Sequence, residues 1–139
     1  MSRGVDGAEA VRSFIEAFND EDLDAFVAVL DPEVEIQASR GIVIGHDEAR
    51  RWATRNPNGY LRQRLILDRV EIEGAHVIAT VRRQWYWGHR TGDRDAGRVV
   101  DEHELTIVAT MRGGRIARWQ PFEDPDEAMA AAGRARGSG

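Results

Sequence analysis

Three polar residues on two neighbouring predicted strands have the types and spacing needed for acid–base chemistry. Asp101 and His103 alternate along one strand, so their side chains point to the same face of the sheet. If Trp85 pairs with Asp101, Arg83 lies opposite His103 on that face. His103 could then take a proton, Asp101 could fix its tautomer, and Arg83 could hold an anionic oxygen. A solvated ion-pair network at the end of the sheet is the alternative.

Asp68 is a further candidate acid or base. Extending the same register through the turn Gly74-Ala75 places Asp68 on that face, between Ile66 and Val70. There it would be a desolvated carboxylate in an apolar setting. A β-bulge would turn it to the other face, where an exposed Asp68 could pair with an arginine.

Apolar and aromatic side chains could enclose a small molecule. The deep positions are apolar, and tryptophans with a tyrosine gather near the predicted mouth, where their rings could stack on a planar ligand. The candidate ligand-binding residues are Phe14, Phe18, Trp52, Tyr60, Trp85, Trp87, Leu105 and Ile107. Packing of the same rings in the core or in a dimer is the alternative.

Two missing residue types exclude whole classes of chemistry. The chain has no Cys, which excludes thiolate nucleophiles, disulfides and iron–sulfur clusters. All 19 residues counted as Lys or Arg are Arg, which excludes Schiff-base catalysis. The four His residues are scattered and make no ligand set of three or four, so we expect neither a metal nor a cofactor.

The elements that must position these residues follow from hydrophobic periodicity and turn signals. Apolar stripes at helical spacing predict helices over Ala8–Phe18, Glu21–Leu30 and Asp47–Arg55, with Asp20 as the cap of the second. A final short helix is expected after Asp124-Pro125, ending at Gly133. Alternation predicts the strands Glu33–Ser39, Leu61–Glu73, His76–Trp87, Val99–Arg112 and Arg115–Phe122, whereas Gly41–Gly45 is typical of a loop.

Helices followed by a long meander indicate an α+β fold. The 139 residues suit one domain, with an ordered core over about 8–133, a loose leader before it, and a flexible tail at 134–139. We expect a curved, mixed or antiparallel sheet wrapped around three N-terminal helices, plus a short C-terminal helix.

Charge and hydropathy indicate which partners to expect. The net charge of −5 and the scattered arginines argue against nucleic acid. Apolar runs are too short for a membrane span, and the N-terminus lacks a secretory signal, so a cytoplasmic location is expected. Ile78, Val108 and Trp119 share the predicted outer face, which suggests a homodimer interface.

Two long segments carry a family resemblance. Residues 11–30, VRSFIEAFNDEDLDAFVAVL, with the DPEVEI that follows, and residues 111–133, MRGGRIARWQPFEDPDEAMAAAG, resemble SnoaL-like proteins of the nuclear transport factor two-like superfamily. The resemblance implies a cone-shaped fold whose curved sheet faces a pocket. That superfamily includes isomerases, cyclases, dehydratases, epoxide hydrolases and domains that only bind.

The resemblance also implies where catalytic residues would stand. The ketosteroid isomerase set falls on Phe14, on Ala38 or Gln37, and on Ile107. The cyclase Asp falls on Gln120-Pro121, and the Arg-x-Asp of limonene epoxide hydrolases falls on Arg82-Arg83-Gln84. None of these positions carries the required acid. A standard reaction of the family is therefore not expected. The apolar deep positions Phe14 and Ile107 and the aromatic rim favour a binder of a small apolar or aromatic molecule, with an enzyme of unusual acid–base set or a dimeric interaction module as alternatives.

Overall fold

The computed structural model describes residues 3–38, 41–54, 61–88 and 97–137. Within these ranges the chain forms helices and strands in the order α1 (Arg3–Asp20), α2 (Leu23–Ala28), β1 (Leu30–Ala38), β2 (Gly41–Ile44), α3 (Gly45–Ala53), β3 (Leu61–Glu73), β4 (His76–Trp87), β5 (Val99–Arg112), β6 (Arg115–Phe122) and α4 (Pro125–Gly137). None of the helices in these ranges is long and apolar enough to cross a bilayer.

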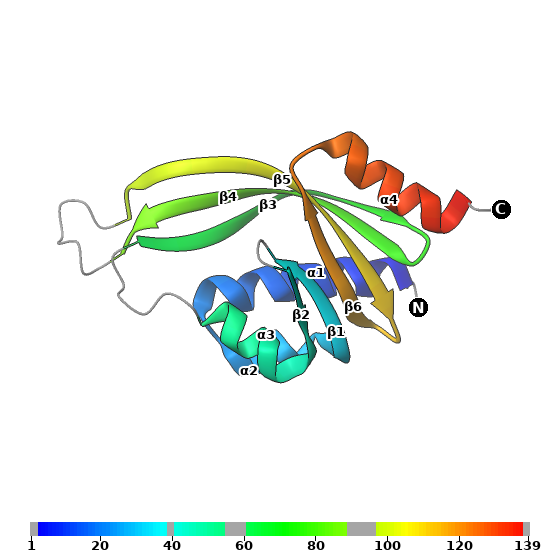
Figure 1. The fold of residues 1–139 in the computed structure, drawn as a ribbon, viewed down its shortest axis with the longest axis horizontal. Helices are drawn as coiled ribbons and strands as arrows, with labels where there is room; N and C mark the ends of the chain where they lie inside the picture. Colours follow the sequence, from blue (N-terminus) through cyan, green and yellow to red (C-terminus); the bar gives the residue numbers. More distant parts are fainter. Residues whose placement is uncertain (1–2, 39–40, 55–60, 89–96, 138–139) are drawn as a thin grey trace.

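One six-stranded sheet runs in the order β2-β1-β6-β5-β4-β3. Strands β1 and β6 are parallel, and every other neighbouring pair is antiparallel. The sheet curves, with α1, α2 and α3 on one face, called the inner face here, and α4 on the opposite, outer face (Figure 1). The predicted α+β fold, a curved mixed sheet around three N-terminal helices with a C-terminal helix, is confirmed.

The expected register between β4 and β5 is confirmed. Trp85 pairs with Asp101, and Arg82 pairs with Glu104. This register gives the inner face its apolar half, where Val81 and Ile107 are buried against the helices. Beyond that half the strands continue to what we call the open end, where β4 stops at Trp87 and β5 starts at Val99 (Figure 1). The helical layer covers only part of the sheet, so inner-face residues at the open end are not sealed in the core.

The N-terminal helix starts earlier than expected. Residues 3–7, predicted as a loose leader, form the first turns of α1. Gly7 explains this extension, because it is buried so close to Val77 that a Cβ at Gly7 would come within 2.8 Å of the Val77 Cγ2 atom. The close approach lets the helix continue along the sheet.

The second helix is shorter than expected. It is capped by Asp22, not Asp20, because the Asp22 side chain accepts a hydrogen bond from the Ala25 N–H at 3.2 Å. It ends at Ala28, and Leu30 already belongs to β1. The Val29 carbonyl accepts from the Ile116 N–H at 2.9 Å, which draws the chain into the sheet beside β6.

Three further segments differ from the sequence prediction. The segment expected as a loop forms β2, which pairs with β1 as a hairpin. The helix α3 follows at once from Gly45, whose φ of +84° suits glycine, so it begins two residues before the predicted Asp47. The helix α4 does not end at Gly133 but continues to Gly137.

The predicted outer patch of Ile78, Val108 and Trp119 is wrong. A bulge at Ala117 shifts the β5–β6 register so that Trp119 pairs with Ala109 and faces inward. Trp119 is 2% exposed and stacks on Phe14 with ring centroids 3.7 Å apart. Ile78 and Val108 do face outward, but α4 covers them through Ala128 and Ala132. These three residues therefore form no exposed interface.

Candidate functional site

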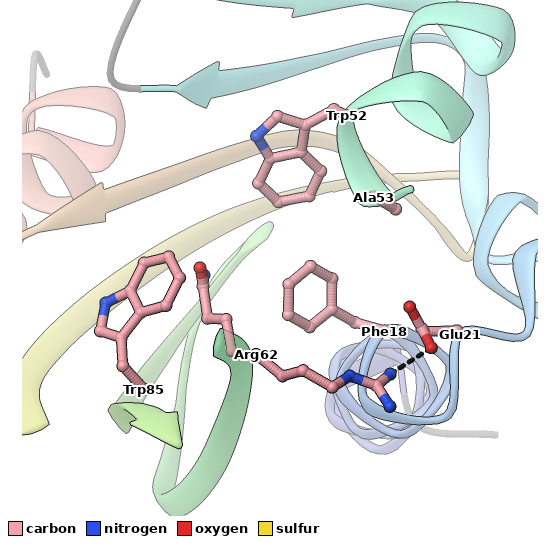
Figure 2. Close-up of a pocket in the computed structure, with 7 residues that line it drawn as sticks. Phe18, Glu21, Trp52, Ala53, Arg62 and Trp85 are labelled. Carbon is pink, nitrogen blue, oxygen red and sulfur yellow. Dashed lines mark hydrogen bonds and ion pairs between the residues drawn. The ribbon is translucent and has the colours of Figure 1, made fainter. Parts of the chain in front are cut away.

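A small cavity opens between the helices and the sheet, toward the open end. It encloses about 70 Å³ and is lined by Phe18, Glu21, Trp52, Ala53, Arg62, Gln63 and Trp85. Three elements supply its aromatic walls, with Phe18 from α1, Trp52 from α3 and Trp85 from β4 (Figure 2). We call these three rings the aromatic slot.

The slot is held in place by the aromatic core behind it. The Phe18 and Trp52 ring centroids are 5.6 Å apart, and Trp52 lies 6.2 Å from Phe26. Phe26 in turn contacts Phe14 at 4.8 Å. Tilted and offset ring contacts of this kind favour one arrangement of the rings. The core therefore fixes the positions of Phe18 and Trp52, while Trp85 stands on the sheet opposite them.

One ion pair stands at the rim of the cavity. The Arg62 guanidinium on β3 donates to the Glu21 carboxylate, which lies between α1 and α2 (Figure 2). Glu21 has a φ of +56°, a left-handed conformation that is uncommon for residues other than glycine. Sequence reasoning placed Glu21 in a helix and did not consider either residue for the site. The helix-breaking pair Asn19-Asp20 was the available signal that the chain turns there.

The predicted group at the end of β4 and β5 does come together. Arg83 pairs with His103 across the strands, and the His103 Nε2 atom lies 3.0 Å from the Asp101 Oδ2 atom. Both acid–base side chains are well exposed, at 47% for His103 and 56% for Asp101. Asp101 also accepts from the Glu102 N–H at 3.0 Å. His103 is thus oriented by a carboxylate, in a position open to solvent.

Arg83 and Trp87 each carry a buried donor without a partner. The Arg83 Nε and the Trp87 Nε1 atoms are both buried and have no hydrogen-bond partner among the described residues. Both residues belong to the inner-face set of β4, and Trp85 stands between them. Buried donors are normally paired, so two unpaired donors on one strand mark this stretch as unusual.

The expectation that Asp68 faces the pocket is wrong. Leu67 pairs with Val81 but Arg69 pairs with Thr80, so Asp68 is the extra residue of a bulge and turns outward. There its carboxylate accepts bidentate hydrogen bonds from Arg82, with the Nε to Oδ2 distance at 2.9 Å. These hydrogen bonds, followed by the charge of Asp68, raise the pKa of Arg82 above its usual value.

The remaining ligand-binding candidates divide between core and open end. Phe14, Leu105 and Ile107 are buried in the hydrophobic core and do not line the cavity. Trp87 lies at the open end, and Tyr60 falls outside the described residues. The space predicted as a deep apolar pocket is therefore filled by side chains, and the cavity begins further out, at Phe18.

Two other histidines of the described residues, His46 and His76, make structural contacts. The His46 Nε2 atom lies 2.9 Å from the Leu30 carbonyl, and the His76 Nδ1 atom lies 3.1 Å from the Thr110 hydroxyl. Over the described ranges, no three His, Cys, Asp or Glu side chains are grouped closely enough to hold a metal ion.

The comparison with protein families decides what this cone-shaped fold is. The model of the SnoaL-like domain matches residues 11–119. The chain belongs to the SnoaL-like domain family. No curated protein matches its sequence.

Solved structures share the fold of this SnoaL-like domain. A candidate polyketide cyclase from Xanthomonas campestris pv. campestris is 24% identical, with a TM-score of 0.70 over 94% of this chain and 99% of that one. An M. tuberculosis LEH-like epoxide hydrolase is 18% identical, with a TM-score of 0.68 over 96% and 94%. TerC, crystallised with polyporic acid, is 18% identical, with a TM-score of 0.67 over 94% and 98%. At these identities the likeness concerns the fold alone.

Three glutamines at positions that the family resemblance suggested face away from the slot in this SnoaL-like domain. Gln37 and Gln120 lie on the outer face, where the Gln120 Nε2 donates to the Gln37 Oε1 at 3.4 Å. Gln84 also points outward and accepts from the Arg64 Nε at 2.8 Å. These side chains point away from the aromatic slot, so they have no access to a molecule bound there.

Proposed function

We propose that this SnoaL-like domain binds a small aromatic molecule in the aromatic slot. The observation that supports this proposal is the arrangement of Phe18, Trp52 and Trp85 around one opening. The enclosed space holds only a few waters, so one ring of the ligand enters it and the rest lies toward the open end. The similar fold of TerC, which was crystallised with polyporic acid, supports a small organic ligand.

Replacement of Trp85 tests this function. We expect W85A to weaken binding of an aromatic probe by about tenfold or more, because it removes one wall of the slot. Binding is measured by isothermal titration with 2-naphthoate and its methyl ester. Tyr86 is the matched control, since it is the next aromatic residue on β4 and faces outward over Arg64. Equal losses for W85A and Y86A would count against the slot.

An enzyme is the second candidate, and the oriented His103 favours it. A histidine held by a carboxylate at 3.0 Å is a common proton acceptor, and it faces inward beside Arg83. A molecule that binds the slot would be converted by the wild-type protein and not by H103Q, as measured by mass spectrometry of the recovered ligand. D68N is the control that keeps the conversion, because Asp68 faces outward. Loss of conversion in D68N, or its persistence in H103Q, would exclude this role for His103.

A further inference from the structure

The buried, unpartnered side-chain groups of β4 are hydrogen-bond donors, so a ligand that pairs with them must supply acceptors. The side-chain groups found buried and unpartnered in the described residues are both donors, the Arg83 Nε and the Trp87 Nε1. The ion pairs of the described residues leave Arg83 out. An arginine is always charged, so Arg83 presents a positive charge and a buried N–H with nothing to receive it.

Arg83 and Trp87 do not line the cavity, but they flank Trp85, which does, on the same face of β4. Successive inner-face residues of a strand are about 7 Å apart, so Arg83 and Trp87 each stand roughly that distance from Trp85. Gln63, which pairs with Trp85 across the strands, also lines the cavity. A ring stacked beside Trp85 therefore has a donor on either side of it along the strand.

The charges around the cavity favour an anion over a cation. Glu21 is the carboxylate that lines the cavity, and Arg62 already neutralises it. Asp101 is engaged by His103 and by the Glu102 N–H. A cationic ligand would have to displace one of these partners, whereas an anionic oxygen placed next to Trp85 could pair with Arg83 without displacing any.

We propose that the slot is specific for aromatic molecules that carry an anionic oxygen, such as aromatic carboxylates or phenolates, with Arg83 binding that oxygen and Trp87 donating to a second acceptor. This inference rests on the proposed function, because it specifies which ligands the slot takes. Arg83 thereby becomes the residue that selects among aromatic ligands, while Phe18, Trp52 and Trp85 hold the ring.

Three probes with one ring system test the selectivity. They are 2-naphthoate, methyl 2-naphthoate and 2-naphthylmethylammonium, which present an anionic, a neutral and a cationic group. Titration of the wild-type protein is expected to show 2-naphthoate binding about tenfold or more tighter than the ester, and the ammonium weakest. Equal affinity for the acid and the ester, or preference for the ammonium, would overturn the inference while leaving the proposed function intact. No binding of any probe would overturn the proposed function itself.

Substitutions in β4 test which side chains produce this preference for the anionic probe. R83Q should lose the preference for 2-naphthoate while its affinity for the ester stays within about twofold. R83K should keep part of the preference, because it keeps the charge and loses the guanidinium geometry. W87F, which keeps an aromatic side chain but removes the indole N–H, should weaken both oxygen-bearing probes. R64Q on the outer face is the control and should behave as wild type. A full preference in R83Q, with native circular dichroism, would contradict the role of Arg83.

Discussion

At the scale of single residues, Asn19 shows how one side chain joins the helical layer to the sheet edge. The strand β3 lies at the edge of the sheet, so the backbone groups along its free edge have no strand partner within the described sheet. The Asn19 carboxamide donates to the Leu65 carbonyl and accepts from the Leu65 N–H, both at 2.8 Å. Such a pair mimics a neighbouring strand and blocks edge-to-edge association at that point. It also fixes α1 beside the cavity that Phe18 lines.

Removal of this carboxamide should destabilise the fold. We expect N19A to lower the free energy of unfolding by about 1–3 kcal/mol, because two partly buried backbone groups lose their partner. Urea denaturation followed by circular dichroism measures the change. D20A is the neighbouring control, since Asp20 is exposed at the end of α1. A loss for N19A no larger than that for D20A would show that the edge contact contributes little.

At the scale of elements, two bulges decide which side chains face the cavity. The structure has the register that was assumed for β4 and β5, with Trp85 opposite Asp101, and from that register alternation correctly gave the side on which Arg83 and His103 lie. Alternation failed at Asp68, which is itself the extra residue of a bulge, and at Trp119, which follows the bulge at Ala117. In both strands the extra residue reverses the alternation of side chains. Neither bulge contains a Gly or Pro to signal it, so residue type carried no information there.

The inward position of Trp119 has a measurable consequence for stability. We expect W119A to cost about 3–5 kcal/mol, because it removes a buried ring that stacks on Phe14 and leaves a cavity. Arg118, its exposed neighbour, provides the control, and R118A should stay within about 0.5 kcal/mol of wild type. Both are measured by equilibrium unfolding in urea. A small effect of W119A would instead fit an outward-facing Trp119.

At the scale of the whole molecule, the sheet is divided into a packed half and an open half. The packed half lies under α1–α3, and the open half extends past them to the end of β4 (Figure 1). The cone was implied by the family resemblance, and the sequence indicated its division because apolar and polar-aromatic residues occupy successive stretches of the same strand face. It could not predict how far the core fills the cone, since that depends on rings from distant elements, such as Phe14 and Trp119, meeting in space.

This division should appear in amide hydrogen exchange. The strands β4 and β5 cross both halves, so each strand serves as its own control for sheet hydrogen bonding. We expect amides of Val77–Val81 and Leu105–Ala109 to exchange about tenfold or more slowly than those of Gln84–Trp87 and Asp101–Glu104, after correction for intrinsic rates. The helical layer buries the first set, so its opening requires loss of core packing, whereas the second set opens locally.

Uniform protection along β4 and β5 would contradict this picture, because it would mean that the open half opens only when the core unfolds. The slot would then be a rigid extension of the core. With graded protection, the slot lies where the molecule opens most readily, between the packed rings of Phe18 and Trp52 and the freer end of β4 that carries Trp85. A ligand bound there contacts both halves. Its binding should therefore slow the exchange of the Gln84–Trp87 amides by a factor of about one plus the ratio of free ligand concentration to Kd.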